Sequence, residues 1–125
     1  MGYILENEAY KFLPGLLRRD FGIETEERLV RRYVRDSRGA DIEVNIIGKA
    51  RREDREVLIV GESKSQLSKN DIDRFVRKKL GRLEDTGSEM FPVLVTHMIA
   101  QPDAEEYAKE KGIAIYFSYD FTDRV

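Results

Sequence analysis

The 125-residue sequence contains no cysteine, no tryptophan and only one histidine, His97. Without cysteine the chain forms no disulfide, no thiolate metal site and no cysteine nucleophile. A single histidine does not build a histidine-rich zinc site. Any bound metal ion must therefore rely mainly on oxygen ligands.

Long hydrophobic runs and a strong net charge are also missing. No stretch approaches the roughly 18 apolar residues that a membrane span needs, and the N-terminus lacks the basic start and apolar run of a signal peptide. We therefore expect a soluble, cytoplasmic protein without membrane association. Because the formal net charge is only −2, nucleic acid could be attracted by a local basic patch but not by the molecule as a whole.

The residues that are present suit one compact core beneath a densely charged surface. Hydrophobic residues make up 41% of the chain and charged residues 37%, which disfavours intrinsic disorder. The length fits one domain, and no internal repeat or linker divides it. We expect a single domain over residues 1–125.

Hydrophobic periodicity predicts an α/β fold. Ile42, Val44 and Ile46 alternate with polar residues as in a strand, and the unbroken apolar run 57–61 is typical of a strand in the middle of a sheet. Ser68 and Asp71 have the spacing of a helix-capping box. The predicted helices span 7–21, 69–85 and 102–112, and the predicted strands span 24–34, 40–47, 57–61, 91–99 and 113–117. This order gives a three-strand meander and further strands in a mixed β-sheet flanked by helices.

Two local features complete this prediction. Pro14 and Gly15 lie inside the first helix, where a missing backbone donor favours a kink or break. The polar segment 48–56 is predicted to be a solvent-exposed hairpin connection.

Three charged residues could converge at the end of the meander. Asp41 begins one strand, and Glu62 and Lys64 end its neighbour. Residues i and i+2 share a face, and an antiparallel partner lies about 5 Å away. Unpaired charges are costly at the end of a buried strand, so a bound divalent cation would explain the cluster.

Magnesium or manganese would suit such a cluster. Asp41 and Glu62, with the backbone carbonyl of Ser63, are suitable hard oxygen ligands. The ion would polarise a phosphodiester, and Lys64 would orient the attacking water or stabilise developing charge. The expected chemistry is phosphodiester hydrolysis, although a structural salt bridge between Lys64 and either acid is an alternative.

The segments GADIEVNIIG and LIVGESKSQ, which follow an acidic helix, resemble the PD-(D/E)XK nuclease superfamily over about residues 8–117. That superfamily includes restriction endonucleases and archaeal Holliday-junction resolvases. The pattern is also similar to small prokaryotic proteins with a Gly-Glu-x-Lys-Ser segment before a helix. Ala40 stands where the family name has proline.

This resemblance implies a restriction-endonuclease-like core and Mg²⁺-dependent or Mn²⁺-dependent cleavage of DNA in repair, recombination or defence. It carries Asp41 and Glu62 over to the metal-binding acids, Lys64 to the motif lysine and Glu8 to the acid of the first helix. Glu6 is the alternative for that helical acid.

Two groups of basic residues are candidates for contact with the DNA backbone. They are Lys69, Arg74, Arg77 and Lys78 on the second helix, and Arg51 and Arg52 in the segment 48–56. An ion-paired, solvated helix is the alternative for the first group. A non-catalytic module that binds nucleic acid or protein is the alternative function, and a homodimer or a partner subunit that supplies DNA affinity would be compatible with either.

Overall fold

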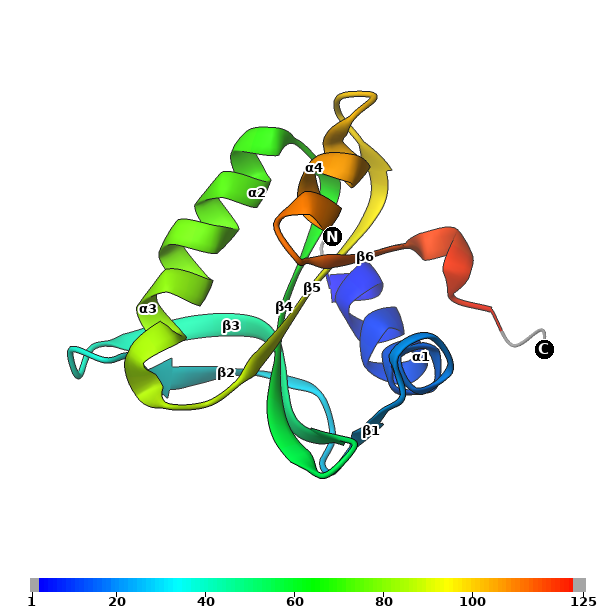
Figure 1. The fold of residues 1–125 in the computed structure, drawn as a ribbon. Helices are drawn as coiled ribbons and strands as arrows, with labels where there is room; N and C mark the ends of the chain where they lie inside the picture. Colours follow the sequence, from blue (N-terminus) through cyan, green and yellow to red (C-terminus); the bar gives the residue numbers. More distant parts are fainter. Residues whose placement is uncertain (1–2, 123–125) are drawn as a thin grey trace.

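The structure is a computed structural model that describes residues 3–122 (Figure 1). The predicted domain spans residues 1–125, of which residues 1–2 and 123–125 lie outside the described residues. The chain forms α1 (Tyr3–Phe21), β1 (Ile23–Thr25), β2 (Val30–Arg35), β3 (Asp41–Arg52), β4 (Arg55–Leu67), α2 (Lys69–Phe75), η1 (Val76–Leu80), α3 (Gly81–Leu83), η2 (Glu84–Thr86), β5 (Met90–Ile99), α4 (Ala104–Glu110), β6 (Ala114–Phe117) and η3 (Ser118–Asp120).

One mixed sheet organises these elements. Its strand order is β1-β3-β4-β5-β6, and β2 pairs with β3 outside this path. The β3–β4 pair is antiparallel, whereas the β4–β5 and β5–β6 pairs are parallel. This arrangement confirms the predicted α/β fold, and the apolar run 57–61 lies in the middle strand β4 as expected.

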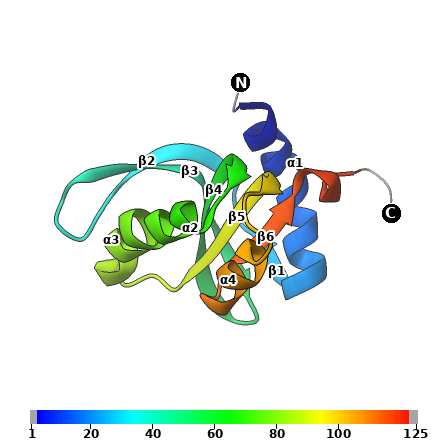
Figure 2. The ribbon, with the colours of Figure 1, turned by 90° about the horizontal axis from the view of Figure 1, so that it is seen from above.

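Helices cover both faces of the sheet (Figures 1 and 2). On one face, Leu13 and Leu17 of α1 pack with Ile46 and Ile59 of the sheet. On the other face, Ile72 and Phe75 of α2 pack with residues of the sheet and of α3 and α4. We call these the α1 face and the α2 face. No helix within residues 3–122 is both long enough and apolar enough to span a membrane.

Three local predictions were wrong. The predicted strand 24–34 is two strands, β1 and β2, and most of the predicted connection 48–56 belongs to β3 and β4. Only Glu53 and Asp54 remain between these strands, and Glu53 adopts a left-handed φ of 57° that allows so tight a turn. Charged side chains on the exposed part of this hairpin hid the alternation that would have predicted it.

The third concerns the predicted kink or break at Pro14, of which the break does not occur. Helix α1 runs through this residue. Leu13 and Leu17, on either side of it, are fully buried against the sheet. This packing compensates for the backbone hydrogen bond that Pro14 cannot donate, so the helix continues through it.

A β-bulge in β3 separates two parts of the sheet. The β2–β3 register shifts between Val30 and Arg32, which face Ile47 and Val44. As a result Val44 and Ile47 both pack on the α2 face, whereas Ile46 packs on the α1 face. The β3–β4 pairing ends at Ile46 and Gly61. We call this point the fork, because beyond it β3 pairs with β2 alone.

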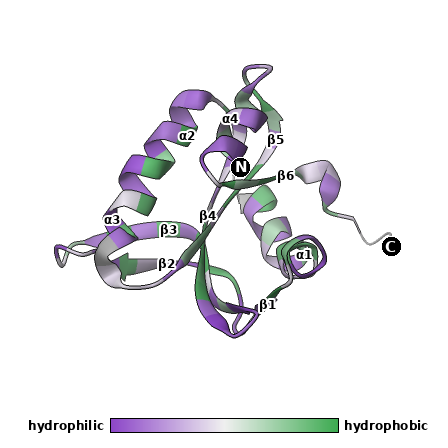
Figure 3. Ribbon diagram, viewed as in Figure 1, coloured by the Kyte–Doolittle hydropathy of each residue, from purple (hydrophilic) through white to green (hydrophobic). Residues whose placement is uncertain are grey.

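The second predicted helix exists but is irregular. It begins with the expected capping box, in which Ser68 and Asp71 bond to each other's backbone N–H groups. Its middle, η1, is a π-helical turn, a feature that often occurs at functional sites. Hydrophilic residues dominate the ribbon of α2, interrupted by the hydrophobic residues that face the sheet (Figure 3).

Candidate active site

Glu62 and Lys64 share the α2 face just beyond the fork. Val60 packs in the core on this face, and residues two and four positions further along the strand point the same way. Glu62 is partly buried. Burial raises the pKa of Glu62 above its ordinary value, although nearby Lys79 and Lys64 favour its charged form. The carboxylate is therefore desolvated and surrounded by cations.

Lys64 forms its ion pair with the capping acid of α2. Its Nζ lies 3.7 Å from Oδ1 of Asp71. Asp71 also accepts hydrogen bonds from the backbone N–H and the hydroxyl of Ser68. Burial opposes ionisation of Asp71, but these hydrogen bonds and the nearby cations hold its pKa below the ordinary value. The capping pattern gave the position of Asp71 but not this contact with Lys64.

Asp41 does not lie directly across from Glu62, contrary to the expectation. Continued past the fork, the β3–β4 register would place Asn45 across from Glu62. Asn45 does reach β4, because its Oδ1 accepts the backbone N–H of Ser63 at 3.3 Å. Asp41 lies four residues from Asn45 along β3, which corresponds to about 13 Å of extended chain. The simple cross-strand argument failed because the two-residue turn at Glu53 and Asp54 fixes a register in which Asp41 lies four residues beyond the position across from Glu62.

Asp41 is exposed at the start of β3. Its Oδ1 lies 3.6 Å from Nε of Arg35, its neighbour on β2, and 61% of its side chain is exposed. Because Ile42 and Val44 point to the α2 face, alternation points Asp41 away from that face. Glu62 points toward it.

The two acids nevertheless line one cavity of about 370 Å³ beside the fork. The cavity lies between β3, β4 and the helix α2–η1–α3, and its lining residues are Asp41, Ile42, Glu43, Glu62, Arg74, Phe75, Lys78, Lys79 and Arg82. Four of these residues are cations from one helical segment. Three of those four have partners: Lys79 donates to the backbone carbonyl of Glu43, Arg82 bonds to Asp36, and Nη1 of Arg74 lies 3.5 Å from Oδ1 of Asp71. The cavity therefore combines acids on its strand side with positive charge on its helix side.

The structure distinguishes the two candidate acids of α1. Glu8 is half-exposed, and its carboxylate pairs with Lys11 on the same helix. Glu6 is only 3% exposed and accepts two hydrogen bonds from Arg31 of β2, at 2.9 and 2.7 Å. Glu6 rather than Glu8 therefore faces the sheet, on the α1 face.

Glu6 belongs to a network that joins α1 to the strands near the fork. The hydroxyl of Tyr10 donates to Glu6 and lies 2.7 Å from the backbone carbonyl oxygen of Asn45. Arg31 also lies 3.0 Å from the carboxylate of Glu43. Burial, followed by the bond to Glu6, raises the pKa of Tyr10. Sequence reasoning missed Arg31, which has no periodic or motif signal.

The predicted DNA-binding residues of the second helix fall into two groups. Arg74 and Lys78 line the cavity, and Arg77 is exposed on the same segment. Lys69 instead pairs with Asp103, with Nζ and Oδ2 2.5 Å apart. The structure therefore brings Arg74 and Lys78 to the two acids and gives Lys69 a structural partner.

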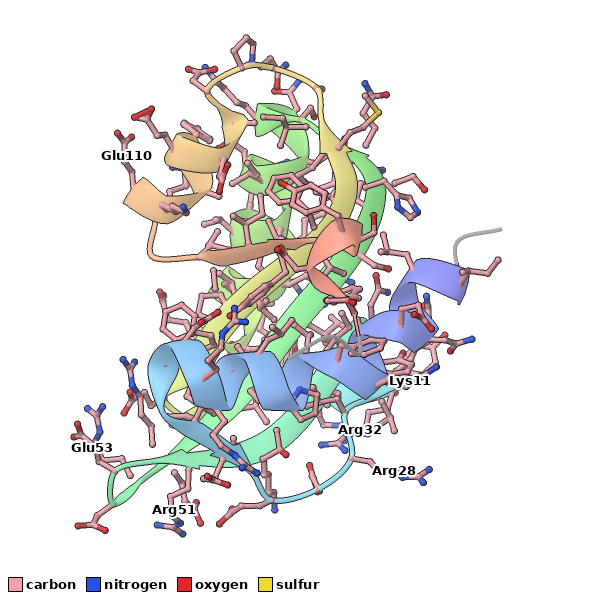
Figure 4. All side chains as sticks on the ribbon, turned by 90° about the vertical axis from the view of Figure 1, so that its right-hand side faces the viewer. Lys11, Arg28, Arg32, Arg51, Glu53 and Glu110 are labelled. Carbon is pink, nitrogen blue, oxygen red and sulfur yellow. The ribbon has the colours of Figure 1, made fainter. Side chains whose placement is uncertain are left out.

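Arg51 and Arg52 lie at the opposite end of β3 from Asp41. Ten residues separate Arg51 from Asp41 along the strand, about 33 Å. Arg51 pairs with Glu26, and Figure 4 shows it beside the hairpin turn that contains Glu53. These two arginines and the cavity therefore do not form one surface.

The atoms of the cavity that could bind a metal ion are the carboxylate oxygens of its acids. Within residues 3–122, no three acidic or histidine side chains gather closely enough to hold a metal ion by themselves. Magnesium is commonly held by one or two carboxylates, with water and phosphate completing its shell. Asp41 and Glu62 fit that type of site, and a complete protein cage is absent from the described part of the chain.

Comparison with known proteins identifies no family. No family model matches the sequence, and no curated protein matches it. A crystal structure of AF1548, a protein of unknown function, is similar with a TM-score of 0.60 and 16% identity, covering 94% of this chain and 60% of that one. This likeness supports the fold alone.

Two further solved structures are similar over most of this chain. A repair endonuclease from Pyrococcus abyssi has a TM-score of 0.49 and 15% identity, covering 84% of this chain and 44% of that one. EndoMS in its apo form has a TM-score of 0.43 and 11% identity, covering 86% and 45%. The chain thus spans less than two thirds of the length of each of the three structures.

Proposed function

We propose that this chain is a metal-dependent nuclease that hydrolyses DNA phosphodiester bonds at the cavity beside the fork. The observation that carries the proposal is the position of Glu62. Contrary to the expectation, β4 continues past Glu62 to Leu67. The desolvated carboxylate of Glu62 directly follows the buried segment 57–61, with Lys64 on the same face and Asp41 in the same cavity. The adjoining helix adds positive charge that suits a phosphate.

In this proposal Asp41, Glu62 and the backbone carbonyl of Ser63 hold Mg²⁺ or Mn²⁺. When bound, such an ion polarises the phosphodiester and lowers the pKa of a coordinated water. Asp41 must exchange Arg35 for the ion. The Asp41–Arg35 pair is exposed on both sides, so its loss costs only about 0–1 kcal/mol.

The other residues act on the water and on the DNA. Lys64 orients the attacking water or stabilises charge on the phosphorane. Arg74 and Lys78 contact backbone phosphates from the helix side of the cavity. Such contacts position DNA without reading its sequence.

Cleavage assays with Mg²⁺ or Mn²⁺ on duplex, single-stranded and branched DNA test the proposal. Glu62→Gln and Lys64→Ala should each lower the rate about a hundredfold or more, because both groups act at the reacting phosphate. Glu56→Gln is a matched control, since Glu56 is exposed at the other end of the same strand. Unchanged rates in Glu62→Gln and Lys64→Ala would contradict the assignment.

A non-catalytic binding module is the second candidate function. Two observations favour it: Asp41 points away from the face that carries Glu62, and no cluster of three potential ligands occurs in the described residues. Calorimetric titration with Mn²⁺ separates the two functions. Binding that Glu62→Gln abolishes supports the nuclease, whereas no binding at millimolar Mn²⁺ by the folded chain supports the module.

A further inference from the structure

Positive charge is concentrated in the segment 28–38, which contains β2. The segment has five arginines and one acid, a formal charge of +4 in a chain whose net charge is −2. The arginines are Arg28, Arg31, Arg32, Arg35 and Arg38. The acid, Asp36, is buried and bonded to Arg82 of α3. It therefore contributes little negative charge to the surface.

An exposed aromatic ring lies in the middle of this basic strand. Tyr33 is 67% exposed, which is unusual for a large hydrophobic side chain on a strand. It shares one face of β2 with Arg31 and Arg35, because these residues are two positions away on either side. Among the described strands β2 pairs with β3 only. The ring is therefore accessible to a ligand.

The cavity borders this face at β3, although the face itself points away from α2, because Val34 packs on the α2 face and Tyr33 alternates with it. In the β2–β3 ladder Tyr33 faces Glu43 and Arg35 faces Asp41. Glu43 and Asp41 both line the cavity. A chain of nucleotides that lay along this face of β2 would therefore approach the cavity from its Asp41 side, opposite the side that carries Glu62.

Further cations lie between β2 and α1, most of them beside acids. Lys11 and Arg28 line a common cavity of about 590 Å³ between α1 and the loop before β2, together with the acids Glu26 and Glu27. Figure 4 shows Lys11, Arg28 and Arg32 on one side of the molecule, directed outward. Lys11 pairs with Glu8 and Arg32 with Glu27, so a phosphate would have to replace these exposed partners.

The cations of this surface differ in how free they are to bind phosphate. Arg31 holds Glu6 and Glu43 and therefore fixes the strand in place. Within residues 3–122, Arg35 makes an exposed pair with Asp41, which phosphate can replace. Arg38 is exposed in the turn after β2, and only its backbone N–H is bonded to Asp36. Arg35 and Arg38 are therefore the candidates for phosphate contact.

We propose that Tyr33, Arg35 and Arg38, the β2 platform, bind single-stranded DNA by stacking an unpaired base on Tyr33 and contacting the flanking phosphates. This inference rests on the proposed function, for which it names the substrate class: DNA that carries an unpaired segment. An aromatic ring flanked by cations is the arrangement that binds single strands without sequence preference. In a duplex the base faces are already stacked and are not available to Tyr33.

Binding of fluorescent oligo-dT, measured by anisotropy in EDTA, tests the platform apart from cleavage. The chain should bind oligo-dT more tightly than a blunt duplex. Tyr33→Ala should weaken oligo-dT binding about tenfold, and Tyr33→Phe should leave it nearly unchanged, because a ring is sufficient for stacking. Tyr119→Ala is the matched control, since Tyr119 is 73% exposed on η3, far from β2 (Figure 1).

The absence of tryptophan from the sequence allows a direct reporter of stacking. In Tyr33→Trp the new side chain is the only indole, and oligo-dT should quench its fluorescence. In Tyr119→Trp the fluorescence should not change. Unquenched Tyr33→Trp, or Tyr33→Ala that binds oligo-dT as tightly as the unmodified chain, would overturn the platform.

The two proposals fail in different ways. If oligo-dT binding depends on Tyr33 but no metal-dependent cleavage occurs, the platform stands and the nuclease fails. If cleavage depends on Glu62 while Tyr33→Ala binds and cuts single strands normally, the nuclease stands and the platform fails.

Discussion

Replacing Glu6 with glutamine should destabilise the fold, because this carboxylate joins α1 to β2 in a buried position. Glu6 accepts two hydrogen bonds from Arg31 and one from Tyr10. Glutamine keeps the size of the side chain but loses its charge and cannot accept both bonds from the guanidinium. It also brings an amide donor toward the donors of Arg31.

The size of the stability loss in Glu6→Gln follows from the exposure of Arg31 and from its other contacts. A hydrogen bond to a charged group contributes about 1.5–3 kcal/mol, and loss of one partner of a fully buried ion pair costs about 3–5 kcal/mol. Arg31 is one-third exposed and keeps Glu43 at 3.0 Å, so water and Glu43 offset part of the loss. We expect a cost of about 2 kcal/mol. With a urea m-value of roughly 2 kcal/mol per molar, the unfolding midpoint should fall by about 1 M.

Glu8→Gln is the control for this experiment. Glu8 lies two residues further along the same helix, and its pair with Lys11 is exposed. Its loss should cost only about 0.3 kcal/mol. Urea unfolding followed by circular dichroism measures both variants. If Glu6→Gln lowers the midpoint no more than Glu8→Gln does, the network does not stabilise the fold as argued.

Two further predictions concern a close approach of the backbone at the fork and an acid-sensitive ion pair. At Gly61 an added Cβ would lie 2.8 Å from Cγ1 and 2.9 Å from the carbonyl oxygen of Val93, so Gly61→Ala should lower the free energy of unfolding, measured in urea, by about 1–3 kcal/mol. At Gly15, in helix α1, an added Cβ would meet nothing within 4 Å, so Gly15→Ala should raise the free energy of unfolding by about 0.5–1 kcal/mol. Equal effects of the two changes would contradict this account. The Arg82 guanidinium, with backbone N–H donors, holds the pKa of Asp36 below its usual range. The stability that Asp36 contributes is therefore complete above its ordinary pKa of about 3.9 and is lost as pH falls through its lower folded-state value. Asp36→Asn should make the unfolding midpoint less dependent on pH below about 4, and an unaltered pH dependence would refute this reasoning.

The sequence by itself determined the elements whose signals are local. Alternation of Ile42 and Val44 predicted a strand, the capping pair Ser68 and Asp71 predicted the start of α2, and the apolar run 57–61 predicted the central strand. These features depend on side-chain periodicity and on neighbouring backbone groups, so they can be read without knowledge of distant contacts. The same local rules placed Glu62 and Lys64 on one face.

Only the tertiary structure decided how those elements meet. The register of the β3–β4 hairpin places Asp41 four residues beyond the position across from Glu62, and the bulge near Ile46 turns Asp41 away from the face that carries Glu62. Contacts with Arg31 distinguish Glu6 from Glu8. A bulge is one residue inserted into a ladder, and its position depends on packing against both faces of the sheet at once, which periodicity in one segment does not contain.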